Sequence, residues 1–209
     1  MGAEGKKEKW LGRALVEGAI AGVVAPVVVL VIVTAASGHL QELLREPSCA
    51  DPKDLTLIRP SAATASTPVY EDVYNEQPVS YPPENAIDTN TGTAWVEGAE
   101  GYGVGASITF AFGEQRDIRL ICVVNGYALN EDRYRANGRV RQFDVTTDQG
   151  EKTAVLSDLP VDEITTFQRL RLPEGPTRSV TLKIGSTSSM GGSQAATDTA
   201  VSEVEFWGH

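Results

Sequence analysis

The sequence predicts an all-β domain of antiparallel strands that follows one apolar helix able to cross a membrane. Two observations predict the strands: several short segments alternate apolar and polar residues, and clusters of Gly, Pro, Asn and Asp separate these segments. A third observation predicts the helix, because residues 18–36 contain no ionisable side chain. The 209 residues suffice for one ordinary domain and additional segments.

The strand pattern extends from about Leu57 to the C-terminus. The run 118–124 is almost wholly apolar, which is typical of a central strand, and residues 148–150 (Asp-Gln-Gly) favour a hairpin turn. Further strands are predicted at 107–112, 143–145, 153–156, 167–172, 180–184 and 201–207. One helical turn is expected near Pro83. Seven or more short strands without amphipathic helices between them favour an antiparallel sandwich or jelly roll.

Residues 18–38 are predicted to form a transmembrane helix. The apolar run would be roughly 28 Å long as a helix, close to the thickness of the hydrocarbon core of a bilayer. A buried core helix is the first alternative, but this segment is apolar on all sides. A cleaved signal peptide is the second, because Val33-Thr34-Ala35 resembles a cleavage site, although the apolar run is longer than usual.

The flanking charges predict the orientation of this helix. Lys6, Lys7, Lys9 and Arg13 precede it, and positive charge stays on the cytoplasmic side. We therefore expect a cytoplasmic stub at 1–17, a juxtamembrane linker at 39–56 and an extracellular domain at 57–209. The cell membrane is the predicted location.

The excess of arginine over lysine and the richness in alanine and valine hint at a GC-rich bacterial genome.

Charge and histidine content exclude several functions. The formal net charge of −10 disfavours binding to nucleic acid or to anionic lipid. The only histidines, His39 and His209, lie at the membrane edge and at the C-terminus, so Ser-His, Cys-His and histidine-zinc chemistry are not expected within the domain. A carboxylate pair could support glycoside hydrolysis, with Glu97 or Asp132 as candidates, but no motif marks a pair. We expect no enzyme.

The two cysteines, Cys49 and Cys122, allow two interpretations. In an extracellular domain a disulfide would tether the linker to the strand at 118–124. The alternative is that Cys122 is a buried free thiol within its apolar run.

The first candidate binding segment is a tight loop between Asn85 and Trp95. Asp88, Asn90 and Thr93 place three hard oxygen donors in this glycine-containing loop, as Ca²⁺ prefers. The alternative is a turn stabilised by hydrogen bonds from side chains to the backbone.

The second candidate segment follows the predicted central strand and is rich in aromatic, amide and guanidinium groups. Its residues include Asn125, Tyr127, Tyr134, Asn137 and Arg139. Aromatic rings that stack on sugar faces and planar polar groups that reach hydroxyls are what a carbohydrate site needs. The alternative is that the tyrosines pack against the sandwich and the arginines pair with nearby acids.

Taken together, these segments resemble the discoidin or coagulation factor 5/8 (F5/8) type C family of galactose-binding-like domains, over about residues 57–207. Within it, the sequence is most similar to the branch named after the translocation domain of streptococcal NAD glycohydrolase. The NAD-cleaving module is absent, so the resemblance implies no such activity. The matching motifs are Asn85–Trp95, Trp95–Gly98, Gly101–Gly105, Val124–Tyr127, Tyr134 with Asn137 and Arg139, and Ser202–Phe206.

The resemblance implies an eight-stranded jelly roll with a structural calcium site and a ligand site on the loops at one end. The implied calcium ligands are Asp88, Asn90, Thr93 and Glu203, while Trp95 is expected in the core. The implied ligand-binding residues are Tyr102, Asn125, Tyr127, Tyr134, Asn137 and Arg139. The sequence thus predicts a membrane-anchored, non-catalytic module that binds a cell-wall or host glycan. The alternative is a protein-interaction domain with a partner in the cell envelope.

Overall fold

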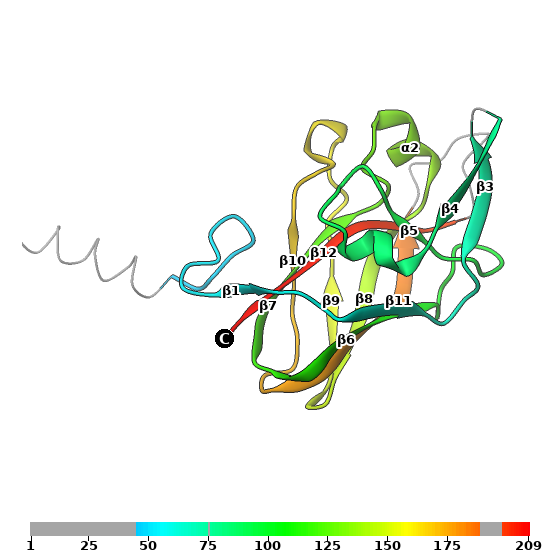
Figure 1. The fold of residues 1–209 in the computed structure, drawn as a ribbon. Helices are drawn as coiled ribbons and strands as arrows, with labels where there is room; N and C mark the ends of the chain where they lie inside the picture. Colours follow the sequence, from blue (N-terminus) through cyan, green and yellow to red (C-terminus); the bar gives the residue numbers. More distant parts are fainter. Residues whose placement is uncertain (1–44, 75, 189–197) are drawn as a thin grey trace, which may run out of the picture. The chain divides into compact units, whose positions relative to one another are not determined.

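The computed structural model describes residues 45–74, 76–188 and 198–209, which form an antiparallel sandwich of two five-stranded sheets (Figure 1). The predicted membrane helix at 18–38 lies outside these residues. No helix within the described ranges is long and apolar enough to span a membrane. The all-β prediction for the domain is confirmed.

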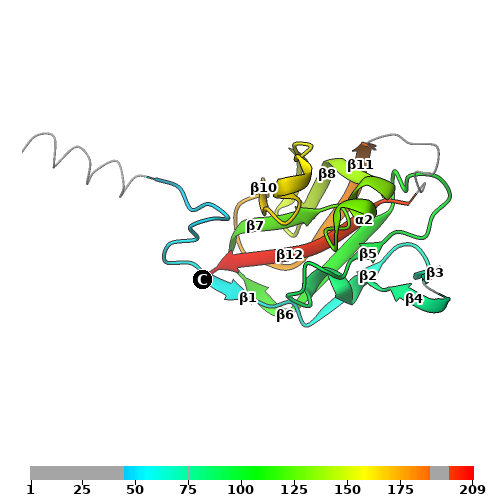
Figure 2. The same cartoon turned by 90° about the horizontal axis from the view of Figure 1, so that it is seen from above.

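The first sheet is built around β12, the last strand of the chain. Its strands are β1 (Thr56–Ile58), β5 (Trp95–Val96), β7 (Ile118–Asn125), β10 (Gln168–Leu170) and β12 (Ala200–Gly208). Figure 2 shows β12 between β1 and β7, and β10 pairs with the other edge of β7. All of these pairings are antiparallel. β7 is buried at nearly every position, as expected for its nearly uninterrupted apolar run.

The second sheet has the order β2-β6-β11-β8-β9. Its strands are β2 (Ala62–Ala65), β6 (Ser107–Arg116), β8 (Arg139–Thr147), β9 (Gly150–Val155) and β11 (Thr177–Ser188). The predicted hairpin turn joins β8 to β9. Gly150 there has φ of 125°, a conformation that favours glycine. The alternation of buried and exposed residues in β6 and β8 directs one face of this sheet to the core.

The core lies between the sheets and is rich in phenylalanine. The ring of Phe206 from β12 lies 5.0 Å from that of Phe110 and 5.2 Å from that of Phe112, both from β6. Burial of one such side chain contributes about 1.5–3 kcal/mol. Trp95 is 1% exposed within the same core, as the resemblance implied.

Several elements were not predicted. They are the hairpin β3 (Tyr70–Tyr74) and β4 (Gln77–Tyr81), the strands β1, β2 and β5, the helix α2 (Glu131–Ala136) and the short 3-10 helix η2 (Val161–Glu163). The 3-10 helix η1 (Pro83–Ile87) is where one turn was expected. α2 is short, and its N-cap Asn130 accepts a hydrogen bond from the backbone N–H of Arg133. The 6 residues of α2 are too few to show an amphipathic period, so the sequence pattern does not reveal this helix, and the cap stabilises its first turn.

Cys49 and Cys122 form a disulfide, with Cα atoms 5.7 Å apart. The bond fixes the segment before β1 to β7. Leu55, Leu120 and Cys122 are buried in a small cluster beneath it, against which Phe167 and Trp207 pack. Of the two interpretations of the cysteines, the disulfide is therefore the correct one.

Candidate functional site

An open pocket lies where the β3–β4 hairpin, α2 and the segment entering β12 meet. Figure 1 shows α2 and this hairpin near the same end of the sandwich. The pocket measures about 330 Å³ including its open mouth. Its polar and aromatic lining residues are Tyr70, Asp72, Tyr81, Tyr127, Arg133, Asn137 and Asp198. It thus joins residues that are far apart in the sequence.

Three tyrosines form the aromatic part of the pocket. The ring of Tyr81 lies 5.9 Å from that of Tyr70 and 5.7 Å from that of Tyr127, centroid to centroid, the second pair meeting edge to face. Tyr81 and Tyr127 are buried, whereas Tyr70 is partly open to solvent. The guanidinium of Arg133 lies 5.8 Å from the centroid of the Tyr127 ring. These contacts hold the tyrosine rings in fixed positions.

Carboxylates dominate the charge of the pocket. Asp198 is 9% exposed and accepts a hydrogen bond from the hydroxyl of Tyr70. Burial raises the pKa of Asp198, and the nearby charge of Asp72 raises it further. Burial also raises the pKa of Tyr70 to about 12, with the hydrogen bond to Asp198 as the next cause. Tyr70 therefore stays protonated and can donate to Asp198 at neutral pH.

Glu97 lies in the loop after β5, close to Asp198. It is fully buried; its Oε1 accepts the backbone N–H of Thr199 at 3.1 Å, and its Oε2 accepts that of Ala99 at 2.8 Å. Burial raises its pKa, and the negative charge of Asp198 adds to this effect. Gly103 packs directly on this carboxylate, since a Cβ atom there would lie 2.1 Å from Glu97 Cδ. Glu97 thus anchors the loop 97–103 to the residue that follows Asp198.

The six predicted ligand-binding residues do not all reach the pocket. Tyr127 and Asn137 line it. Tyr102 is 38% exposed in the neighbouring loop, and its carbonyl oxygen accepts a hydrogen bond from the Thr199 hydroxyl at 2.9 Å. The other three, Asn125, Tyr134 and Arg139, are buried.

The buried three have their polar groups engaged within the domain. The Asn125 side chain exchanges hydrogen bonds with the backbone of Val140, at 2.8 and 3.0 Å. Arg139 donates to the carbonyl oxygen of Tyr134 at 3.0 Å and to Asp158 Oδ1 at 3.2 Å, and its guanidinium lies 4.7 Å from the Tyr134 ring centroid. These side chains hold α2 and the start of β8 in place, and the direct ligand contact expected of them stays a prediction.

Sequence reasoning did not assign Tyr70, Asp72, Tyr81, Arg133 or Asp198 to the site. A weak signal for the first three existed, because residues 70–74 and 77–81 each contain valine and tyrosine, which favour strands, on either side of a polar turn at 75–76. Nothing in the sequence places this hairpin beside α2, since the contact is tertiary.

The predicted cation loop, residues 88–93, is a compact turn that is rich in oxygen atoms. Asp88 accepts the backbone N–H of Asn90 through Oδ1 at 2.9 Å and the Thr93 hydroxyl through Oδ2 at 2.7 Å. The carbonyl oxygen of Asn90 accepts from the same hydroxyl at 2.7 Å. Thr89 has φ of 64°, a left-handed conformation more usual for glycine. This geometry is compatible with both interpretations of the sequence, a Ca²⁺ site and a turn stabilised by hydrogen bonds from side chains to the backbone.

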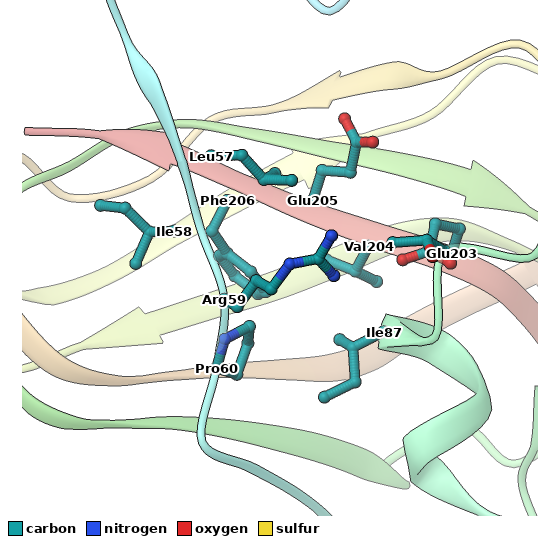
Figure 3. Close-up of a pocket in the computed structure, with 10 residues that line it drawn as sticks. Leu57, Ile58, Arg59, Pro60, Ile87, Glu203, Val204, Glu205 and Phe206 are labelled. Atoms are coloured by element: carbon teal, nitrogen blue, oxygen red, sulfur yellow. The ribbon is translucent and has the colours of Figure 1, made fainter.

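Glu203 brings a second carboxylate to this loop. Figure 3 shows it on β12 near Ile87, at one end of a shallow pocket that Arg59 and Phe206 also line. It is 3% exposed, and its Oε2 has no hydrogen-bond partner among the described residues. Burial, and then the charge of Asp88, raises its pKa to about 7, although the backbone N–H groups of Thr89 and Asn90 donate to it.

The residues present fit a hard cation. An unpartnered, buried carboxylate oxygen beside a second carboxylate is costly without a positive charge, and hydroxyl, amide and carbonyl oxygens complete a donor set that suits Ca²⁺. The four predicted ligands, Asp88, Asn90, Thr93 and Glu203, lie in one neighbourhood. Among the described residues, no three His, Cys, Asp or Glu side chains are placed so that they could hold a metal ion together, so such a site would depend on two carboxylates and neutral oxygens.

The domain is a two-sheet antiparallel sandwich with an oxygen-rich loop and an open pocket among its loops. The family model of the NAD glycohydrolase translocation F5/8 type C domain matches residues 61–207. The chain belongs to that family, which confirms the resemblance seen in the sequence. No curated protein matches the sequence.

Solved structures share the fold. The CBM32-1 and CBM32-2 domains of ZmpB from Clostridium perfringens align with a TM-score of 0.51 and 12% identity, over 72% of this chain and 35% of theirs. The same domains in complex with GalNAc align with a TM-score of 0.51 and 12% identity, over 72% of this chain and 33% of theirs. The chain thus spans about a third of the length of each structure, and the likeness is one of fold.

Proposed function

We propose that this domain is a carbohydrate-binding module that acts at the outer surface of a cell membrane and binds without turnover. The observation that carries the proposal is the pocket between α2 and the β3–β4 hairpin. Tyrosine rings, the Arg133 guanidinium, the Asn137 amide and the Asp198 carboxylate converge there in an F5/8 type C fold. Rings that contact sugar C–H faces and planar groups that bind hydroxyls suit a glycan.

The disulfide supports the proposed location, and the charge disfavours one class of partner. A Cys49–Cys122 bond forms and persists in oxidising, extracytoplasmic surroundings. The net charge of −10 disfavours a nucleic acid partner. In the proposed arrangement, residues 18–38 anchor the chain in the membrane and the domain faces outward.

We also propose that the 88–93 loop and Glu203 bind a structural Ca²⁺. Asp88 and Glu203 would supply the negative charge, and Asn90 and Thr93 would supply neutral oxygens. The bound ion would neutralise the Glu203 carboxylate. The role of these residues is to fix the loop that links η1 to β5 against β12.

Binding is best tested with the full chain in a detergent without a sugar headgroup, on a broad glycan array in calcium-containing buffer. The ZmpB domains were solved with GalNAc, so this sugar is a first ligand to include. We expect a coherent group of related glycans to bind. A blank array from folded protein would contradict the proposal.

Two variants of neighbouring arginines localise the site. Arg133 lines the pocket, whereas Arg135 is 51% exposed on α2 and pairs with Glu131 at 2.7 Å. We expect Arg133→Gln to weaken glycan binding at least about 10-fold, because one charge-assisted hydrogen bond is worth about 1.5–3 kcal/mol. Arg135→Gln, the matched control, should leave affinity unchanged. Equal effects of both changes would place the site elsewhere.

A protein partner is the second candidate function, and exposed apolar residues favour it. Val73 in β3 is 68% exposed, and Val104, after the glycine-rich turn, is 64% exposed. A protein partner could bury these side chains, which gains about 25 cal/mol for each Å² of apolar surface removed from water. Capture of one specific envelope protein that free sugars do not displace would favour this candidate.

A further inference from the structure

We propose that the pocket selects sugars that carry a free, protonated amine over N-acetylated and acidic sugars. This inference depends on the proposed glycan-binding function and specifies the class of ligand. It is carried by an unequal charge balance around Asp198, by the aromatic rings beside it and by the lining of the pocket.

Among the described residues that line the pocket, the two carboxylates of Asp72 and Asp198 face one cation, Arg133. Arg133 is directed to Asp72, with its Nη1 4.0 Å from Oδ2, and to the Tyr127 ring. Asp198, in contrast, has the neutral Tyr70 hydroxyl as a partner. The more buried of the two carboxylates is thus the one without a close positive charge.

A third carboxylate, that of Glu97, lies close to Asp198 and adds to the excess of negative charge there. Glu97 is fully buried and is bonded to the backbone N–H of Thr199, the residue after Asp198. The charges of Asp198 and Glu97 oppose each other, and burial raises the pKa of both groups. A bound cation would relieve this repulsion, whereas a carboxylate-bearing ligand would increase it.

The aromatic rings favour the same kind of ligand. Tyr81 contacts both Tyr70 and Tyr127, and the negative electrostatic potential of a tyrosine face attracts an ammonium group. Aromatic rings combined with a carboxylate recognise ammonium by cation–π attraction and by a charge-assisted hydrogen bond. An N-acetyl group carries no charge, so it lacks the cation–π attraction, and its neutral N–H donates a weaker hydrogen bond to a carboxylate than an ammonium group does.

The remaining polar groups and the lining of the pocket favour a sugar over a lysine side chain. The pocket is lined by side chains from three separate parts of the chain, so a ring with hydroxyl groups on several sides can contact more of its lining than a single alkyl chain can. The side chains of Asn137 and Arg133 also line the pocket and carry hydrogen-bonding groups, which an amino sugar can use through its hydroxyls and an alkyl amine cannot.

Calorimetric titration of the full chain, in a detergent without a sugar headgroup, tests the selection. The probes are two matched pairs, glucosamine with N-acetylglucosamine and galactosamine with N-acetylgalactosamine, together with galacturonate and n-butylamine. We expect the free amine to bind about 10-fold or more tightly than its N-acetylated partner in at least one pair, which corresponds to about 1.4 kcal/mol. Galacturonate and butylamine should bind more weakly than that amine.

Two variants test whether Asp198 is responsible for the preference for a free amine. Asp198→Asn should reduce the preference for the free amine to about 2-fold or less while N-acetylated sugars bind as before. Asp132→Asn is the control, since Asp132 is exposed and does not line the pocket. It should leave the preference intact. If Asp198→Asn does not fold, Asp72→Asn removes a more exposed carboxylate of the same pocket and should reduce the preference as well.

The outcomes separate the two proposals. An N-acetylated sugar that binds as tightly as its free amine would overturn the selection and leave the glycan-binding function standing. Butylamine that binds as tightly as the amino sugar would overturn the selection for a sugar. A complete absence of sugar binding, with the array blank as well, would overturn both proposals. An equal loss of preference in Asp132→Asn would show that overall charge, not the pocket, attracts the amine.

Discussion

Glu203 combines burial with negative charge in a way that makes stability depend on pH. Its pKa is raised to about 7 from a usual 4.5 by burial and by Asp88. The folded state therefore favours the neutral acid. The resulting stability is fully present below about pH 4.5 and is lost as pH rises through about 7. A shift of this size corresponds to about 3 kcal/mol.

We predict that, in buffer with EDTA, the melting temperature of the full chain falls between pH 5 and pH 8. Glu203→Gln should remove most of this fall. Part should remain, because Glu97 and Asp198 are shifted in the same direction. Calcium should raise the melting temperature at pH 8 in the native chain and much less in the variant. Thermal unfolding followed by circular dichroism measures all of these effects.

Glu205→Gln is the matched control for this experiment. Glu205 lies two residues further along β12, and its Oε2 accepts a hydrogen bond from Trp207 Nε1 at 3.0 Å. Its substitution should leave the calcium effect and most of the pH effect in place, because the charge of Glu205 raises the pKa of Glu203 less than burial and Asp88 do. An equal slope in the Glu203 and Glu205 variants would contradict the assignment of the pH dependence to Glu203.

Arg139 is the residue on which the wall of the pocket depends. It is 1% exposed and donates to the carbonyl oxygens of Tyr134 and Asn137. We predict that Arg139→Met lowers the free energy of unfolding by about 2–4 kcal/mol, because buried acceptors lose a charged donor. Urea unfolding measures this loss. Arg135→Met, on the exposed face of α2, should change stability by less than about 0.5 kcal/mol, as is usual for an exposed ion pair.

At the scale of elements, the disulfide ties the segment before β1 to β7 across a sequence separation of 73 residues. Closing a loop of this length reduces the entropy of the unfolded chain. We predict that the double change Cys49→Ser and Cys122→Ser lowers the free energy of unfolding by about 2–4 kcal/mol. Denaturant unfolding of both proteins measures the difference. Added reductant should destabilise the native chain and leave the double variant unaffected; an equal response of both would contradict the prediction.

The elements differ in how far the sequence could predict them. β6, β7, β8 and β11 carry regular alternation or long apolar runs, so their periodicity alone identified them. The hairpin β3–β4 is mostly exposed, and its regularity comes from cross-strand bonds between Tyr70 and Tyr81 and their neighbours. Such pairing leaves a weak pattern in one sequence.

The same distinction applies to the two sites. The cation loop is local, so Asp88, Asn90 and Thr93 could be found from their spacing, and the resemblance added Glu203. The pocket is assembled from the β3–β4 hairpin, α2 and the entry to β12, and only tertiary packing brings these together. Tyr127, Asn137, Tyr134 and Arg139 lie in one polar segment and are all buried, yet only Tyr127 and Asn137 line the pocket, a difference that packing decides.

At the scale of the whole molecule, the proposed anchor and the disulfide make a joint prediction about topology. Residues 18–38 would span the membrane with the basic residues before them inside, so the domain would form its Cys49–Cys122 bond outside. We predict that the full chain, expressed in bacterial cells, stays in the membrane fraction after a high-salt wash. Protease added to cells with a permeabilised outer layer should degrade the domain and spare an N-terminal tag.

A chain that lacks residues 18–38 is the control for this prediction. It should remain in the soluble fraction, protected from the protease, with both cysteines open to alkylation because the cytoplasm keeps thiols reduced. The native chain should resist alkylation until a reductant is added. A soluble native chain with free thiols would contradict both the anchor and the outward orientation. A membrane-bound chain whose domain is protected from the protease would contradict the orientation alone, because a retained helix would then face the opposite way.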